Sequence, residues 1–252
     1  MDTWLFEASG IGLVLGLLLG LTGAGGSLVA LPLLLSLHLP IRDAVGVSLG
    51  AVAMSAVIGV IPRLRQGLIA WQPVLWLALA GFPGSAVGQW LGQYVPEKAL
   101  VIAFCLLVLW SARRLWLNAA LSEPNNNPRP LYWLGFLGFG VGICSGLLGV
   151  GGGFLIVPGL LALTRLSVQE AMATSIAVIA LVSSSGFLMY FSHAEPSPTL
   201  LAGLALGGGT GVLLGTRLSL YLNSQWLQRI FAIMLVIISF VLAGQKLFGI
   251  AV

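Results

Sequence analysis

Long apolar runs, separated by short polar segments, follow one another along the whole chain. They cover residues 4–22, 44–62, 71–91, 99–116, 131–148, 171–191, 200–222 and 226–247. About twenty apolar residues are what a helix needs to cross the hydrocarbon core of a bilayer. The pattern therefore predicts an all-α polytopic membrane protein, in which shorter apolar arms at 27–39 and 153–163 follow the first and fifth spans.

The segment 16–32 (GLLLGLTGAGGSLVALP) returns as 142–158 (GICSGLLGVGGGFLIVP). The identical pairs are Gly16/Gly142, Gly20/Gly146, Leu21/Leu147, Gly23/Gly149, Gly25/Gly151, Gly26/Gly152 and Pro32/Pro158. Clustered glycines followed by a proline interrupt a helix. Within a bilayer, such a break is tolerated only where protein or a watery cavity satisfies the backbone. Paired breaks in two halves of a chain indicate a transport site.

The repeat extends through both halves once one residue is inserted. An offset of 127 then places Asp43 on Glu170, Ser48 on Ser175, and residues 77–104 on residues 204–231. A polar segment, 122–130 (SEPNNNPRP), separates the halves and is typical of a solvated linker. We expect two repeats, 1–121 and 131–252, each with four long spans and a short arm, and a cytoplasmic linker at 122–130.

Composition supports this class. The chain has 252 residues, of which 58% are hydrophobic and only 7% charged, and its mean hydropathy is +1.05. Such a surface must face lipid, so we expect a multi-pass protein of the cell membrane, in contact with the bilayer. The basic residues lie singly at the ends of apolar runs, which argues against nucleic-acid binding.

The charges also bear on the orientation of the halves. If both halves enter the membrane from the same side, the Lys and Arg residues divide six against five. If each glycine break turns the chain back, the second half is inverted and the division becomes eight against three. The eight are Arg63, Arg65, Arg113, Arg114, Arg129, Arg165, Arg217 and Arg229, and the three are Arg42, Lys98 and Lys246. Because basic residues concentrate on the cytoplasmic side, this count favours two inverted repeats with both termini outside.

Inverted repeats can expose one midplane site to the two sides in turn. At the glycine turns, successive N–H groups and the positive end of the following short helix would form an anion-binding concavity without a buried basic side chain. The turn residues are Thr22, Gly23, Ala24, Gly25, Gly26 and Ser27 in the first half and Gly149, Val150, Gly151, Gly152 and Gly153 in the second.

Two groups of residues have alternative interpretations. For Gly16/Gly20, Gly84/Gly88, Gly142/Gly146 and Gly211/Gly215, we favour close helix packing over a binding role. The hydroxyls of Ser48, Thr174 and Ser175 either reach a substrate or bond back to their own helices, and the sequence leaves both open.

The second glycine segment, GLLGVGGGFLIVPGL, together with its degenerate first copy GLTGAGGSLVALPLL, resembles the TauE/SafE family of sulfite and sulfoacetate exporters. The resemblance covers the whole chain and implies a bacterial cytoplasmic-membrane permease for sulfur-containing anions and organosulfonates. It carries over onto Gly146, Gly149, Gly151, Gly152, Gly153 and Pro158. In the first copy Ser27 replaces the third glycine, and Thr22 and Ala24 replace bulkier residues, which makes the two turns chemically unequal.

No carboxylate or histidine lies in the middle of a predicted span. We therefore expect no enzyme, no metal, no cofactor and no proton relay of carboxylates. A site without a buried arginine would suit a small anion with its charge spread over several oxygens, such as sulfite or a small sulfonate. The alternatives are a gated anion channel and an accessory membrane subunit without flux of its own. The oligomeric state stays open, a homo-oligomer included.

Overall fold

The structure, a computed structural model, is helical throughout the part that it describes. The described residues are 2–23, 26, 30, 33–34, 41–96, 99, 102, 105–106, 108–110, 112–113, 116, 130–148, 152–192, 197–222, 225–226, 229, 232–233, 236–237 and 240. Its helices are α1 (Asp2–Thr22), α3 (Ile41–Arg65), α4 (Trp71–Gly92), α6 (Tyr132–Leu148), α7 (Gly153–Leu163), α8 (Val168–Phe191) and α9 (Pro198–Ser219). No strand occurs among these residues. The predicted all-α class is confirmed.

Six of the predicted spans and the second short arm correspond to these helices, and α7 has the predicted limits. In the predicted spans 99–116 and 226–247 and the arm 27–39, the described positions are helical, and the remainder lies outside the described residues. So does the linker 122–129. By length and composition, four described helices can cross a membrane: Asp43–Arg65, Trp71–Gly92, Val168–Phe191 and Pro198–Ser219. The segments Phe6–Thr22, Tyr132–Leu147 and Gly153–Leu163 are shorter apolar helices.

α3 and α8 form the centre of the bundle and run antiparallel. Gly46, near the start of α3, lies against Tyr190 near the end of α8, whereas Gly59 lies close to Ile176. The hydrophobic windows of both helices are 67% buried, against 39% for α4. On α8 every residue from 171 to 180 is buried. A helix that is apolar all round is buried in this way.

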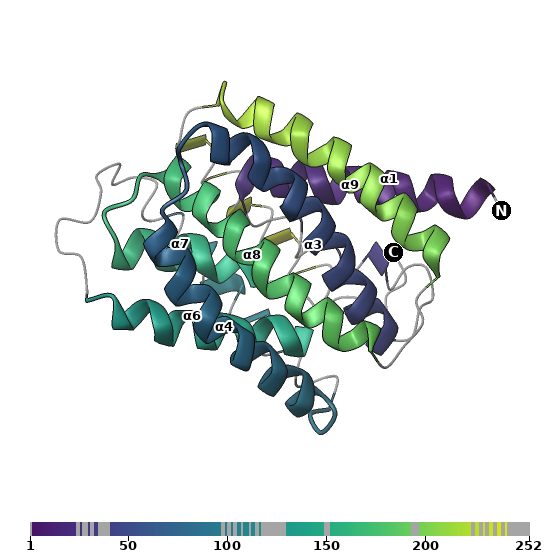
Figure 1. The fold of residues 1–252 in the computed structure, drawn as a ribbon, viewed down its shortest axis with the longest axis horizontal. Coiled ribbons are helices and arrows are strands. Elements are labelled where there is room, and N and C mark those ends of the chain that lie inside the picture. Colours follow the sequence, from purple (N-terminus) through teal and green to yellow (C-terminus); the bar gives the residue numbers. More distant parts are fainter. Residues whose placement is uncertain are drawn as a thin grey trace.

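Each half of the chain packs its first helix on the other half. α1 lies along α9 on one side of the central pair, and α6 lies along α4 on the other, as Figure 1 shows. Both seams consist of glycines that face backbone. Along α1, Gly12, Gly16 and Gly20 lie in turn against Leu204, Gly208 and Val212 of α9. Along α6, Gly138, Gly142 and Gly146 lie in turn against Leu77, Gly81 and Ser85 of α4.

Because the order of contacts rises along both partners, α1 runs parallel to α9 and α6 parallel to α4. Further contacts fix the outer helices relative to the central pair. Ser55 of α3 meets Gly208 of α9, and Gly59 meets Val212, so these helices are parallel. Gly81 of α4 lies against Val182 of α8, and Gly186 of α8 lies close to Gln89 of α4, so α4 runs parallel to α8. Helices α1, α3 and α9 therefore point one way, and α4, α6 and α8 point the other.

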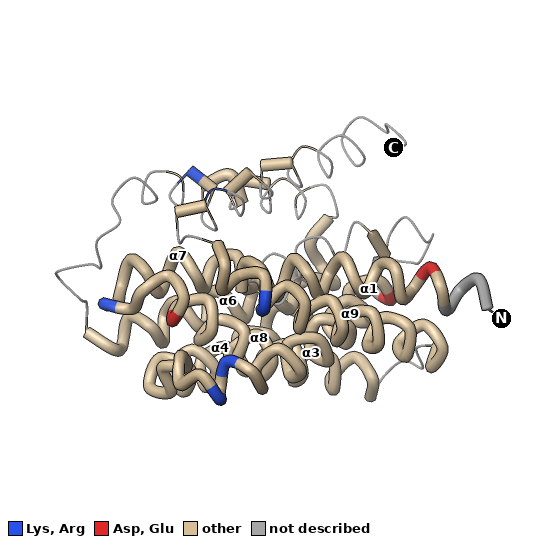
Figure 2. Tube along the Cα trace, turned by 90° about the horizontal axis from the view of Figure 1, so that it is seen from above, with Lys and Arg blue, Asp and Glu red and all other residues tan. Residues whose placement is uncertain are grey.

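These directions bring several charges to one end of the bundle. Arg63 and Arg65 end α3, and Arg217 lies in the last turn of α9. Arg165 lies in the short loop before α8, whose first turn lies at the same end because α8 opposes α3. Asp43, in the first turn of α3, lies at the opposite end. In Figure 2 the blue segments accordingly lie in the half of the view away from the N-terminus.

The second glycine break turns the chain back on itself. Gly152 packs against Val141 of α6, and Gly159, farther along α7, packs against Leu137. α7 thus runs back along α6. In the first half, Gly26 packs against Leu15 of α1 in the equivalent way. The described residues that follow each break thus lie against the helix that precedes it.

Candidate functional site

The first glycine turn begins directly at the end of α1. Gly23 is buried with a φ of 73°, a left-handed conformation that L side chains rarely adopt. Its amide donates to the Leu19 carbonyl oxygen at 2.9 Å. A Cβ atom at Gly23 would lie 2.7 Å from the Met172 Cβ. Glycine is therefore required here both for the conformation and for the approach of α8.

Thr22 is buried beside it, and its hydroxyl donates to the Leu18 carbonyl oxygen at 2.8 Å. Such a bond to the preceding helical turn holds the side chain along α1. The structure thus shows the Thr22 hydroxyl donating within α1.

The second glycine turn starts α7. Gly152 is its N-cap, with φ 67° and ψ 1°, and no side chain caps this helix end. The Leu155 amide donates to the Gly152 carbonyl oxygen at 3.0 Å. Gly152 and Gly153 are both buried. An uncapped helix N-terminus of this kind favours a negative charge, so the anion-binding role of this turn stays a prediction. The other predicted turn residues, Ala24, Gly25, Ser27, Gly149, Val150 and Gly151, lie outside the described residues.

The three candidate hydroxyls have different surroundings. Thr174 is buried and accepts a hydrogen bond from the Ala70 amide at 3.1 Å. Ala70 precedes α4, so Thr174 joins the start of that helix to α8. The Ser175 hydroxyl is buried without a hydrogen-bond partner. The sequence analysis considered contact with a substrate or a bond back to α8 for Thr174. The contact with the Ala70 amide is neither of these.

Ser48 is also buried, but the structure does not bring it to Ser175. Ser48 lies between Gly46 and Gly50, which face Tyr190 and Phe187 near the end of α8. Ser175 lies near the start of α8, beside the level of Gly59. At 1.5 Å per residue, these levels on α3 are roughly 16 Å apart.

The glycines in the long helices serve packing. Side chains at Gly16, Gly20, Gly84, Gly88, Gly142, Gly146, Gly211 and Gly215 would meet the backbone of the neighbouring helix. The packing interpretation of these glycines is confirmed.

The expectation that the site lacks a buried basic side chain is wrong. Arg63 is only 4% exposed, although it stands next to Pro62 at the end of an apolar run. Its Nη2 donates to the Gly20 carbonyl oxygen at 2.6 Å, close to the first glycine turn. Its Nε has no hydrogen-bond partner. The sequence suggested an interfacial arginine like Arg65.

Helical phase is the signal that could have found Arg63. Ala56, Gly59 and Arg63 follow one another at spacings of three and four residues and share one face of α3. That face carries small residues and is buried, whereas Val57 and Ile61 are about half exposed. Arg63 therefore projects toward neighbouring helices. Although it lies near the end of α3, it stays buried between them.

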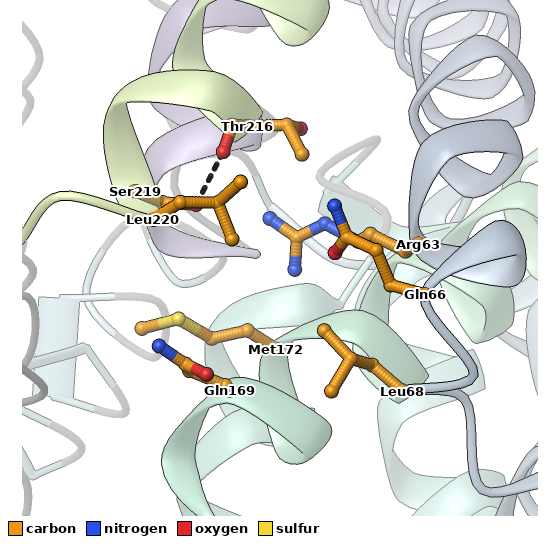
Figure 3. Close-up of a pocket in the computed structure, with 8 residues that line it drawn as sticks. All are labelled: Arg63, Gln66, Leu68, Gln169, Met172, Thr216, Ser219 and Leu220. Carbon is orange, nitrogen blue, oxygen red and sulfur yellow. Dashed lines mark hydrogen bonds between the residues drawn. The ribbon is translucent and has the colours of Figure 1, made fainter.

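A small cavity of about 20 Å3 lies beside Arg63. Its lining comes from the last turn of α3 and the loop after it, from the start of α8 and from the end of α9: Arg63, Gln66, Leu68, Gln169, Met172, Thr216, Ser219 and Leu220. Figure 3 shows the guanidinium extending between the α9 residues and those of α8. Met172 also packs against Gly23, so this cavity borders the first glycine turn.

Comparison with known proteins agrees with this architecture. The family described as "Sulfite exporter TauE/SafE" matches residues 8–242. The chain belongs to the TauE/SafE family. The resemblance seen in the glycine motifs is thereby confirmed, and the protein is an integral membrane protein of a transporter family.

Curated relatives bear similar descriptions. A "Probable membrane transporter protein" of Xylella fastidiosa is 30% identical, with 91% of each chain covered. "Probable membrane transporter protein YdhB" of Bacillus subtilis is 29% identical, over 81% of this chain and 86% of its own. "Probable membrane transporter protein MJ0441" of Methanocaldococcus jannaschii is 26% identical, over 72% and 70%. No solved structure matches.

Proposed function

We propose that this TauE/SafE protein carries a small sulfur-containing anion, such as sulfite or an organosulfonate, out across the cytoplasmic membrane by alternating access between two inverted halves. The observation that carries the proposal is the opposed direction of equivalent helices. α3 and α8 occupy the same place in the repeat and run antiparallel. The same holds for α1 and α6, and for α4 and α9.

Opposed halves give a physical basis for two conformations. Each seam of glycines, α1 on α9 and α6 on α4, has an equivalent in the other half, so either half can adopt the arrangement of the other at similar cost. One conformation would be open to each side of the membrane.

The charge distribution supports the same orientation. Arg63, Arg65, Arg165 and Arg217 share one end of the bundle, whereas halves of parallel orientation would divide them between the two ends. By the concentration of basic residues on the cytoplasmic side, that end would face the cytoplasm.

The substrate class rests on family and chemistry together. The family description names sulfite export. The first turn of α7 has no side-chain cap and Arg63 lies beside the first glycine turn, and both favour a negatively charged solute. Neither feature would attract a sugar or an amine.

Flux measurements on the purified full chain test the proposal. In proteoliposomes, labelled sulfite should enter saturably, and unlabelled sulfite inside should accelerate its entry by counterflow. An organosulfonate should compete, whereas choline and glucose should not. Flux of an amine or a sugar without any sulfur anion would contradict the substrate class. Single-channel current would contradict a carrier, and absence of all flux would favour an accessory subunit.

A further inference from the structure

The geometry points to an oxyanion-binding site made by Arg63 and Thr216 at the end of the bundle where α3 and α9 end. We infer that the transported anion first binds here, where the guanidinium and the hydroxyl contact its oxygens. This inference deepens the proposed function and rests on it. The site borders the first of the two glycine turns to which the sequence pointed, but it uses side chains of α3 and α9 in place of turn amides.

The first argument is that Arg63 is buried with its charge unbalanced. The described structure gives it no salt bridge. Asp43 lies at the other end of α3, and Glu170 accepts from the Ser167 amide at 2.8 Å in a cap of α8. A buried charge without a counter-charge is costly, and a bound anion would remove that cost.

A purely structural role for Arg63 would leave most of its hydrogen-bond donors without a partner. The bond to Gly20 caps the end of α1, where the helix dipole favours a cation. This bond occupies one of five N–H groups of the guanidinium, and Nε has no partner. A planar fork with free donors is the arrangement that binds an oxyanion through two oxygens.

The second argument comes from Thr216 on the facing helix. This threonine is 3% exposed, and its hydroxyl has no hydrogen-bond partner. Thr164 and Thr210, by contrast, donate to the carbonyls of Leu160 and Leu206 in their own helices. Thr216 lines the same cavity as Arg63, so two buried residues with unused donors border one space.

The cavity also contains neutral polar groups and side chains that can move. Gln66 and Gln169 line it, and their amides can donate to further oxygens. A volume of about 20 Å3 holds about one water, so an anion of several oxygens needs the lining to move apart. Met172 is flexible and also packs on Gly23. The Cα, Cβ and backbone oxygen of Met172 make that contact, so this residue joins the lining of the cavity to the first glycine turn.

The equivalent position in the other half has different chemistry. The offset of 127 places Tyr190 on Arg63 and Gln89 on Thr216. Tyr190 donates to the Asp43 carboxylate at 3.0 Å, and Gln89 donates to the Gly186 carbonyl oxygen at 3.2 Å. There the polar groups have partners and the charge is negative. Among the described residues, the anion site thus occurs only at the end of the bundle where α3 and α9 end. This end would face the cytoplasm, from which an exporter takes up its substrate.

Binding to the purified full-length protein in detergent tests the inference directly. Calorimetric titration should use sulfite, sulfate, methanesulfonate, phosphate and acetate as separate probes, with choline as the cation control. We expect R63Q and T216V each to weaken sulfite binding at least tenfold. R63K should lose less sulfite affinity, because lysine keeps the positive charge but lacks the paired N–H donors of the planar guanidinium. The matched controls R65Q and T210V change an exposed arginine and a back-bonded threonine, and should bind like the wild type.

The outcomes separate this inference from the proposed function. Saturable sulfite flux with unchanged sulfite affinity in R63Q and T216V would overturn the site and leave the transporter standing. Phosphate or acetate binding that needs Arg63 and Thr216, without binding of any sulfur anion, would support the site and contradict the substrate class. If no probe binds in a way that depends on these two residues, the inference is wrong. T216V, which keeps the shape of the side chain, decides the test if R63Q does not fold.

Discussion

Gly16 of α1 lies directly against the backbone of Gly208 of α9, with no room for a side chain between the two helices. Helices in lipid gain stability from such close approach, because burial of apolar surface from lipid gives no comparable driving force. The contact belongs to the seam that joins the first helix of the chain to a helix of the second half.

The seam predicts a position-specific effect on stability. Gly16→Val should lower the free energy of unfolding by roughly 1–3 kcal/mol or prevent assembly, because the added atoms meet backbone that cannot move alone. Gly10→Val on the same helix is the control, since a Cβ there has nothing within 4 Å. Thermal unfolding in detergent measures the stability of both variants. Equal melting temperatures for Gly16→Val and Gly10→Val would contradict close backbone contact between α1 and α9.

The second glycine turn predicts a loss of transport. Gly152→Ala places a Cβ on a residue with φ 67° and against Val141, at the start of α7. Gly67 has the same φ of 67°, but open space around it. Gly67→Ala should therefore show only the conformational cost of roughly 1–2 kcal/mol. We expect sulfite flux per folded molecule to fall at least tenfold in Gly152→Ala and to stay near normal in Gly67→Ala; the reverse order would argue against the turn.

Topology can be tested at equivalent positions of the two halves. Arg65 and Ser192 are both exposed and correspond to each other by the offset of 127. In a variant with Cys105 and Cys144 replaced by alanine, Ser192→Cys should react with an impermeant thiol reagent in intact cells. Arg65→Cys should react only after the membrane is opened. Labelling of both from one side would exclude inverted halves.

The Thr174 contact predicts a structural effect at a residue for which the sequence left substrate contact and back-bonding both open. Thr174→Val removes the acceptor for the partly buried Ala70 amide and should cost about 1–3 kcal/mol of unfolding free energy. Thr174→Ser keeps the hydroxyl and should cost less. Denaturant unfolding compares the two variants. A normal unfolding curve for Thr174→Val, with a raised KM for sulfite, would instead support direct contact with the anion.

The sequence predicted the elements better than the contacts between them. The limits of α7 follow from local signals, because glycines end α6 and a polar segment ends the short arm. The end of α1 at Thr22 has the same origin. Glycine spacing also identified the residues of the seams, since glycines four apart on a helix share a face.

The Arg63 site could not be predicted in this way. Whether an arginine at the end of a run reaches water depends on which helices stand beside it, and here α1 and α9 enclose Arg63. The partner of Thr174 is likewise 104 residues away in sequence. Such contacts depend on the tertiary arrangement. The residues expected at the centre of each turn, 24–25 and 149–151, lie outside the described part, so their role stays a prediction.

The exchanged seams also govern how the protein is made. During synthesis α1 enters the membrane long before α9 exists, so its glycine face meets lipid until nearly the whole chain has been translated. α4 is likewise inserted before its partner α6 has been synthesised. A chain that stops at the linker has neither partner helix, so the glycine faces of α1 and α4 stay uncovered. Correct assembly is therefore a late event in the life of the chain, completed only when its last third has been inserted.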